Sequence, residues 1–133
     1  MSGPTQVERL AWVGAGSAAG GLARFGLDAV GGSLFAVFAS NAVGAFAIGL
    51  YAALTGPEGV IAAGPRQRLF VVPGLLAGLT SFSVFSLQAD VLLQSSLTAS
   101  ALFVLGSVGS WAAGVWAGHA LGRGLDARLR TSG

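Results

Sequence analysis

The fold of this chain is decided by residues 74–86, which read Gly74-Leu-Leu-Ala-Gly-Leu-Thr-Ser-Phe-Ser-Val-Phe-Ser86. This stretch places glycine, hydroxyl and phenylalanine residues in the middle of an apolar segment that runs from about Leu69 to Leu93. In a membrane-spanning helix, the polar cluster would lie near the centre of the bilayer. Polar groups and irregular backbone occur at that depth only where they face other protein or line a cavity. The stretch therefore predicts a pore, a transport site or a tightly packed polar interface.

The composition is typical of a membrane protein. Of the 133 residues, 53% are hydrophobic and only 9% are charged, whereas soluble domains have roughly 25% charged residues. The chain has no cysteine, which excludes disulfides, thiol catalysis and thiolate metal sites. Its seven basic residues are all arginines, spread along the chain and clustered only in the C-terminal tail. We interpret them as membrane-flanking charges and expect no nucleic-acid partner.

Four segments are candidates for membrane crossings, because a helix needs about 20 apolar residues to span a bilayer. They are residues 10–30, 33–54, 69–93 and 98–122, and a polar C-terminal tail follows at 123–133. We therefore expect an all-α membrane protein, a single domain over residues 1–133 with four transmembrane helices. The third helix is expected to break near its middle.

The arginines predict the orientation of these crossings. With four spans, both termini and the loop between the second and third spans lie on one side. That side carries Arg9, Arg66, Arg68, Arg123, Arg128 and Arg130. The other side has at most Arg24, so the positive-inside rule predicts that both termini are cytoplasmic.

The fourth segment carries a stripe of small residues at every fourth position. The stripe consists of Gly106, Ser110, Gly114, Gly118 and Gly122. Small residues let two helix backbones approach closely, with van der Waals contacts and weak Cα–H···O bonds between them. The stripe is compatible with packing inside one subunit and with contact between subunits. Because a lone four-helix chain is thin, a pore that shields an ion from lipid would more naturally form between two copies.

The third segment also carries the candidate ion-binding groups. Phe82 and Phe85 are three residues apart and share a helix face. If the helix breaks within residues 77–81, the freed carbonyls can bind a cation, while the amides of the following half-helix favour an anion. Aromatic ring edges are electropositive and can solvate a small anion. The alternative is two core phenylalanines whose neighbouring hydroxyls bond to the preceding helical turn.

Two further polar side chains are candidates. Asn41, close to membrane depth in the second segment, has two N–H donors and an acceptor to satisfy. It serves either as a hydrogen-bonding link between helices or as a pore-lining donor. Arg24, in the first segment, can attract an anion to a vestibule, pair with Asp28 or reach the membrane interface. His119 is the only histidine, and no catalytic triad or nucleotide-binding motif is present in a suitable context. We expect no enzyme.

Three motifs together resemble the Fluc/CrcB family of fluoride channels. Residues 74–85 are similar to the family pattern Gly-x-x-Gly-Gly-x-Thr-Thr-Phe-Ser-Thr-Phe. Asn41-Ala-Val-Gly44 matches an Asn-x-x-Gly element, and Gly20-x-x-Ala23-Arg24-Phe25 matches a Gly-x-x-Ala-Arg-aromatic element of the first span. The resemblance covers nearly the whole chain, and the third-span motif is the specific one.

The resemblance implies two narrow fluoride pores in a dimer of antiparallel subunits. Phe82 and Phe85 would face fluoride, and Asn41 would donate a hydrogen bond in the pore. Ser83 and Ser107 would belong to the polar lining of the pore. The partners would be fluoride, membrane lipid and the second subunit.

The resemblance also implies a structural sodium ion at the dimer centre, which is not transported. Its ligands would be the backbone carbonyls of Ala77 and Thr80, and Arg24 would have a vestibule or structural role. The family resemblance further implies a multi-pass protein of the cell membrane that passively exports fluoride from the cytoplasm and so reduces fluoride toxicity.

Several positions depart from the family pattern. Ala77 replaces a glycine, although a carbonyl ligand needs no particular side chain. Val84 removes a threonine hydroxyl, Ala36-Val37 replaces a Gly-Thr pair, and Phe103 stands where a tyrosine is common. These departures favour a non-conducting or partner-dependent subunit of a heterodimeric channel as one alternative.

The arginine asymmetry adds the hypothesis that the chain pairs with a related subunit of opposite orientation, encoded separately. A small four-helix secondary transporter is the remaining alternative. Such a transporter would need a carboxylate deep in the membrane, and Asp28 and Asp90 lie towards the ends of their segments.

Overall fold

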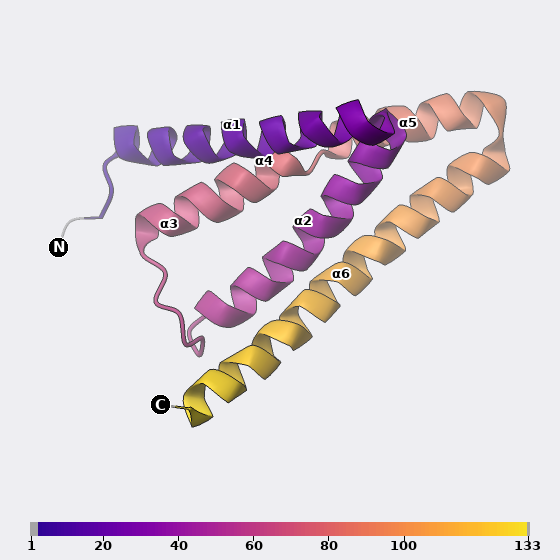
Figure 1. Ribbon diagram of the computed structural model, residues 1–133. Helices are drawn as coiled ribbons and strands as arrows, with labels where there is room; N and C mark the ends of the chain where they lie inside the picture. The colour runs from indigo at the N-terminus through magenta and orange to yellow at the C-terminus, as the bar shows by residue number, and fades with distance from the viewer. Residues whose placement is uncertain (1–2, 133) are drawn as a thin grey trace.

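The computed structural model describes residues 3–132, and no strand occurs in that range. The elements follow in the order α1 (Gln6–Gly31), α2 (Ser33–Thr55), α3 (Pro65–Leu69), the π-helix η1 (Phe70–Leu76), α4 (Ala77–Leu79), α5 (Phe82–Ser95) and α6 (Leu97–Thr131). The prediction of an all-α fold is confirmed. Figure 1 shows the N-terminal end, the loop after α2 and the C-terminal end on the same side of the molecule.

Three stretches of the described residues are long and apolar enough to cross a membrane. They are Ser33–Thr55, Pro65–Ser95 and Leu97–Thr131. The first predicted span falls in α1, which has 26 residues and is about 39 Å long at 1.5 Å per residue. That length suffices for a crossing, but α1 is rich in glycine and is not among the three. The fourth crossing therefore stays a prediction.

The start of α1 is fixed by a capping box. The Thr5 side chain accepts a hydrogen bond from the Glu8 amide, and the Glu8 carboxylate accepts one from the Thr5 amide at 2.8 Å. A guanidinium nitrogen of Arg66 lies 2.8 Å from the other Glu8 oxygen and links α3 to α1. The pKa of the Glu8 carboxyl is lowered, mainly by the hydrogen bond from the Thr5 amide and, to a smaller extent, by the Arg66 guanidinium. At the far end, Gly32 has φ +80°, a conformation that favours glycine, and α2 begins directly after it.

Close backbone contact joins α1 to η1 and α4. A Cβ placed on Gly20 would collide with the backbone of Leu75, and one on Gly78 would collide with the backbone of Ser17. Gly16 lies against the backbone of Gly74 in the same way. Only glycine permits this approach, so the first-span glycines position α1 beside the segment that contains the break.

The small-residue stripe of α6 packs mainly against α2. A Cβ on Gly118 would collide with the backbone of Phe46, and Gly114 and Gly122 also face α2 within 4 Å. For these three glycines, the interpretation as packing inside one subunit is confirmed. Gly106 has no atom within 4 Å of its Cβ position, so the first part of the stripe is open.

The end of α6 differs from the sequence expectation. The helix continues beyond residue 122 to Thr131, through most of the residues predicted as a separate polar tail. Asp126 explains why these turns are held in place. Its buried carboxylate accepts hydrogen bonds from the Val60 amide at 2.7 Å and from Arg130 at 2.9 Å. The loop between α2 and α3 is thereby attached to the last turns of α6.

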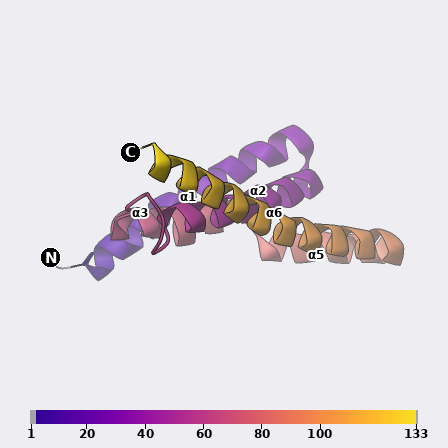
Figure 2. The ribbon, with the colours of Figure 1, turned by 90° about the horizontal axis from the view of Figure 1, so that it is seen from below.

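The hairpin of α5 and the first half of α6 projects past the turn between α1 and α2. Figures 1 and 2 show this projection from two directions. Its exposed apolar side chains include Leu87, Val91, Leu102, Leu105 and Val108. An apolar surface of this kind is covered by lipid or by another protein.

Candidate ion site at the helix break

The third apolar stretch is interrupted at Thr80 and Ser81. Their backbones are extended, with φ −84° and ψ 154° at Thr80 and φ −151° and ψ 113° at Ser81. Helix α4 ends at Leu79 and α5 begins at Phe82. The break lies inside the predicted window of residues 77–81, so the prediction of a broken third helix is confirmed.

The backbone before the break is already irregular. Residues 70–76 form a π-helix that contains Pro73. Proline has no N–H and its ring clashes with the preceding turn, so a helix around it must widen or bend. After the break, the Ser81 hydroxyl accepts a hydrogen bond from the Val84 amide at 3.2 Å and caps α5. The local sequence thus supplies both a weak helix before the break and a new helix start after it.

Asn41 binds the interrupted backbone directly. Its Oδ1 accepts a hydrogen bond from the Ser81 amide at 2.7 Å, and its Nδ2 donates to the Ser81 carbonyl at 3.2 Å. In a continuous helix, the Ser81 amide would donate to the carbonyl of Ala77; here that carbonyl loses its usual partner. Asn41 is only 6% exposed. Its side chain thus replaces water at the break, and the second Nδ2 hydrogen is left to donate elsewhere.

Arg24 reaches the break from α1. Its Nη1 lies 3.4 Å from the Thr80 carbonyl oxygen, near the upper limit for a hydrogen bond. Within residues 3–132, Arg24 forms no ion pair with Asp28. Of the alternatives open for Arg24, pairing with Asp28 is therefore wrong.

The two phenylalanines have different surroundings. Phe85 is 6% exposed, and its ring centroid lies 4.8 Å from that of Trp111 in an edge-to-face arrangement. It also lies 5.4 Å from the ring of Phe103. Phe82 is 72% exposed, although its ring is only 5.6 Å from Phe85. One ring is thus part of a buried aromatic cluster, while the other faces outward from this subunit.

The two candidate serines also differ. Ser83 is exposed, and its hydroxyl lies 3.2 Å from that of Ser81. Ser107 is 1% exposed, and its hydroxyl has no hydrogen-bond partner within the described chain. Buried hydroxyls are usually paired with protein or water. The Ser107 hydroxyl is therefore available to a small ligand.

Trp111 is a candidate site residue that the sequence did not single out. It lies one turn after Ser107 on α6, and its buried indole N–H also lacks a partner among residues 3–132. The residue lines a cavity of about 240 Å³ together with Asn41, Ser81 and Phe82. The spacing of four residues from Ser107 is the signal that would have placed it on the same helix face.

The departures from the family pattern lie beside the site. Val37 and Val84 line a second cavity, of about 260 Å³, together with Arg24 and Asp28. Phe103 packs on Phe85 in the aromatic cluster. The missing hydroxyls thus leave apolar walls at these positions.

The long helices are apolar, and the third span is broken where buried polar groups surround it. These features define a small multi-pass membrane protein with features of an ion pathway. A family described as "CrcB-like protein, Camphor Resistance (CrcB)" matches residues 11–119. The chain belongs to this family, so the resemblance to Fluc/CrcB proteins is confirmed.

Similar proteins are named as ion channels. "Fluoride-specific ion channel FluC 1" of Bradyrhizobium diazoefficiens is 42% identical over 130 residues, covering 90% of this chain and 92% of that protein. The protein of the same name from Rhodopseudomonas palustris is 41% identical and covers 87% of each chain. "Fluoride-specific ion channel FluC" of Opitutus terrae is 34% identical and covers 86% of this chain and 92% of that protein. Because the family is one of channels, the prediction that the chain is not an enzyme is confirmed.

Proposed function

We propose that this chain is a subunit of a dimeric channel that conducts fluoride passively out of the cytoplasm and so limits fluoride toxicity. The observation that carries the proposal is the break at Thr80 and Ser81, which Asn41 holds open inside an apolar stretch. The names of the related channels support fluoride as the permeating ion.

The pore must replace the water that fluoride loses. Stripping water from a small anion is costly, so donors must take its place along the whole path. Asn41 has a spare N–H, and Ser107 and Trp111 carry buried donors without partners among the described residues. A buried donor without a partner costs about 1–3 kcal/mol, and a bound fluoride would remove that cost. The electropositive ring edges of Phe82 and Phe85 would add to the lining, as would the exposed hydroxyl of Ser83.

A second subunit would complete the pathway. Phe82 is largely exposed in one subunit, so a pore lined by this ring needs another wall. The exposed apolar side chains of the α5–α6 hairpin offer a surface for that contact. The family resemblance favours an antiparallel arrangement, in which each subunit crosses the membrane four times.

The carbonyls of Ala77 and Thr80 fit the expected sodium site in part. Ala77 has lost the amide that would bond its carbonyl in a helix, and oxygen ligands suit a hard cation. Within residues 3–132, the Thr80 carbonyl has one long contact, with Arg24 at 3.4 Å. These two groups would hold sodium together with groups of the second subunit. Bound sodium would stabilise carbonyl dipoles that the break leaves exposed.

A partner-dependent subunit is the second candidate, and the arginine positions favour it. Six of the seven arginines lie in segments at one end of the molecule. A chain with this bias is expected to insert in one orientation, with both termini in the cytoplasm. An antiparallel partner would then be a separate, related chain. The channel names of the relatives disfavour a secondary transporter.

Fluoride efflux from liposomes tests the function. Vesicles containing the purified chain, alone or with a related chain of opposite arginine bias, would be loaded with potassium fluoride or potassium chloride. We expect fluoride efflux with at least one of these preparations and little chloride efflux. Equal release of both anions, or no fluoride release from either preparation, would contradict the proposal.

A terminal reporter tests the orientation. In cells that express only this chain, a reporter at the C-terminus is expected to be cytoplasmic in nearly all molecules. A roughly equal mixture of both orientations would show that the chain can supply its own antiparallel partner.

A further inference from the structure

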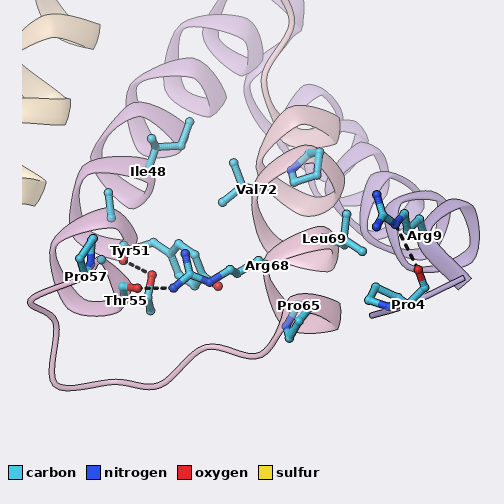
Figure 3. Close-up of a pocket in the computed structure, with 13 residues that line it drawn as sticks. Pro4, Arg9, Ile48, Tyr51, Thr55, Pro57, Pro65, Arg68, Leu69 and Val72 are labelled. Carbon is cyan, nitrogen blue, oxygen red and sulfur yellow. Dashed lines mark hydrogen bonds between the residues drawn. The ribbon is translucent and has the colours of Figure 1, made fainter. Parts of the chain in front are cut away.

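A groove separate from the helix break lies at the arginine-rich end of the molecule. It has a volume of about 670 Å³ and lies between α2 and η1, with the N-terminal segment and the start of α3 at its mouth. Figure 3 shows its lining residues. The fluoride pathway proposed above uses none of them.

The walls of the groove are apolar. Ile48 comes from α2, whereas Leu69, Val72 and Pro73 come from α3 and η1. Ile48 and Val72 are both exposed in the subunit. Because they belong to stretches apolar enough to cross a membrane, this surface suits a hydrocarbon chain.

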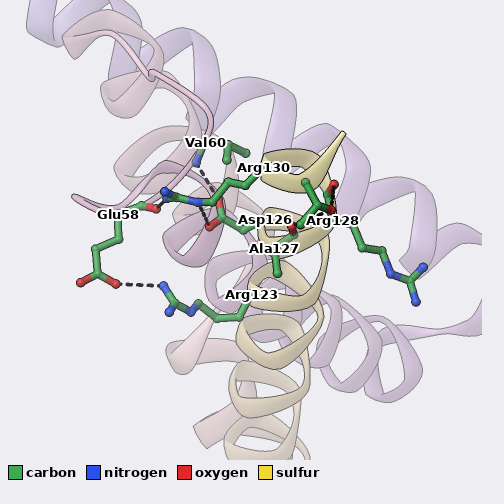
Figure 4. A network of polar contacts seen from close by, with 8 residues as sticks. Glu58, Val60, Arg123, Asp126, Ala127, Arg128 and Arg130 are labelled. Atoms are coloured by element: carbon green, nitrogen blue, oxygen red, sulfur yellow. Dashed lines mark hydrogen bonds and ion pairs between the residues drawn. The ribbon is translucent and has the colours of Figure 1, made fainter. Parts of the chain in front are cut away.

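The mouth of the groove carries positive charge that no carboxylate among residues 3–132 neutralises. Arg66, Arg123 and Arg130 form ion pairs with Glu8, Glu58 and Asp126, and Figure 4 shows the two pairs on α6.

Arg9 and Arg68, which line the groove, have no acidic partner within residues 3–132. Arg9 donates only to the Pro4 carbonyl, and Arg68 donates to the carbonyls of Ala63 and Thr55. Each guanidinium has five N–H donors, so both can also bind an anion.

Tyr51 supplies an independent observation. Its ring lines the groove, and its buried hydroxyl has no hydrogen-bond partner among the described residues. Tyrosine is common where one end of the side chain is apolar and the other meets polar groups of the membrane interface. The hydroxyl therefore lacks a partner at the place where apolar wall and charged mouth meet.

We propose that this groove binds one anionic phospholipid at the arginine-rich end of the protein. An acyl chain lies along the apolar wall, the phosphate lies at the mouth beside Arg68, and the Tyr51 hydroxyl donates to an ester oxygen. Arg9, on the other side of the α3–η1 helix (Figure 3), adds positive charge to the same end of the groove. A neutral lipid matches the wall but leaves the two arginines without a counter-charge. A single lipid in this position joins α2 to the segment that leads into the broken helix.

Native mass spectrometry tests the proposal on the full-length protein in micelles that contain equal amounts of phosphatidylglycerol and phosphatidylcholine. We expect a bound phosphatidylglycerol that free inorganic phosphate does not displace. Arg9→Gln and Arg68→Gln should each weaken its retention roughly fivefold, the contribution expected of one arginine near an anionic lipid. Tyr51→Phe should weaken it as well.

The matched control is Arg128→Gln, which removes an exposed arginine at the same end of the protein, outside the groove and without a carboxylate partner among residues 3–132. Figure 4 shows that Arg128 points away from the ion pairs of α6. It should leave retention unchanged; a loss as large as that of Arg9→Gln would overturn the proposal by indicating general charge attraction. Arg68 also holds the loop between α2 and α3, so its replacement can disturb the fold. Arg9→Gln removes only a contact at the exposed N-terminal end. The comparison of Arg9→Gln with Arg128→Gln is therefore the decisive one.

Val72→Trp tests the location by filling the groove while keeping both arginines. We expect it to abolish lipid retention. Retention that survives this change would overturn the proposal. The proposal would also be overturned if Val72→Trp dissociated a dimer without loss of lipid. A second copy of the chain, and not a lipid, would then occupy the groove.

Discussion

Asn41 and Ser81 are joined by two hydrogen bonds, in which one side-chain amide pairs with both the N–H and the C=O of a single backbone residue. The pairing resembles that of two adjacent strands, but it links α2 to a two-residue gap between helices. It satisfies the backbone where the helix cannot, and it releases the Ala77 carbonyl from its usual partner. The break is therefore a built feature of the fold, not a locally frayed helix.

Asn41→Ala is expected to destabilise the protein and to abolish fluoride efflux. The change leaves the Ser81 amide without a partner, at about 1–3 kcal/mol, and leaves the Ser81 carbonyl with only the long hydrogen bond from the Phe85 amide at 3.4 Å among the described residues. Thermal unfolding in detergent, followed by tryptophan fluorescence, would measure the loss. Asn41→Asp keeps the acceptor for the Ser81 amide and should have a smaller effect on unfolding. A melting temperature unchanged in Asn41→Ala would show that the two hydrogen bonds contribute nothing.

Trp111→Phe separates transport from stability. The smaller ring preserves most of the contact with Phe85 but deletes a donor that has no partner in the part of the chain that the structure describes. We expect fluoride efflux to fall roughly tenfold, which is the value of one hydrogen bond to a charged group, and unfolding to change little. The control is Trp116→Phe, at an exposed position of the same helix. Equal efflux in both variants would remove Trp111 from the proposed pathway.

Gly20→Ala tests the contact between α1 and the segment before the break. Its Cβ would collide with the backbone of Leu75, and overpacking of this kind typically costs about 1–3 kcal/mol. The neighbouring Gly21→Ala serves as control, because no atom lies within 4 Å of its Cβ position. The expected result is a lower melting temperature for Gly20→Ala alone. Equal melting temperatures for the two variants would contradict the close helix contact.

Removal of sodium tests the proposed carbonyl site. If Ala77 and Thr80 hold the ion, purification with N-methylglucamine in place of sodium should lower the melting temperature and reduce fluoride efflux. Thr80→Val is the informative variant, since it removes the hydroxyl that donates to the Leu76 carbonyl but keeps the Thr80 carbonyl. It should show the same dependence on sodium. A protein equally stable without sodium would argue against the site.

The sequence predicted the features that depend on local chemistry. Gly74, Ala77 and Gly78 indicated where the third helix would be weak, and the resemblance to the Fluc/CrcB family made a break there the expectation. Four-residue spacing predicted close packing for the stripe on α6. The choice between packing inside one subunit and contact between subunits required the position of α2, which the spacing alone does not contain.

Other features depend on contacts between segments far apart in the chain. Whether Asn41 would link two helices or line a pore was left open, because its contact with the backbone of Ser81 joins residues 40 positions apart. Asp126 was not singled out, since its partner Val60 lies in a loop without a recognisable motif. That contact accounts for the helical turns beyond residue 122, where a polar tail was expected.

Current recordings across a planar bilayer, with potassium fluoride on one side and potassium chloride on the other, test most directly whether the broken helix is a fluoride pathway. For this chain, with its partner subunit if one is required, we predict a large reversal potential, of the sign expected when fluoride is far more permeant than chloride. We also predict that Trp111→Phe reduces the current while Trp116→Phe does not. A reversal potential that shows equal permeability to both anions, or currents unchanged by Asn41→Ala and Trp111→Phe, would contradict this account.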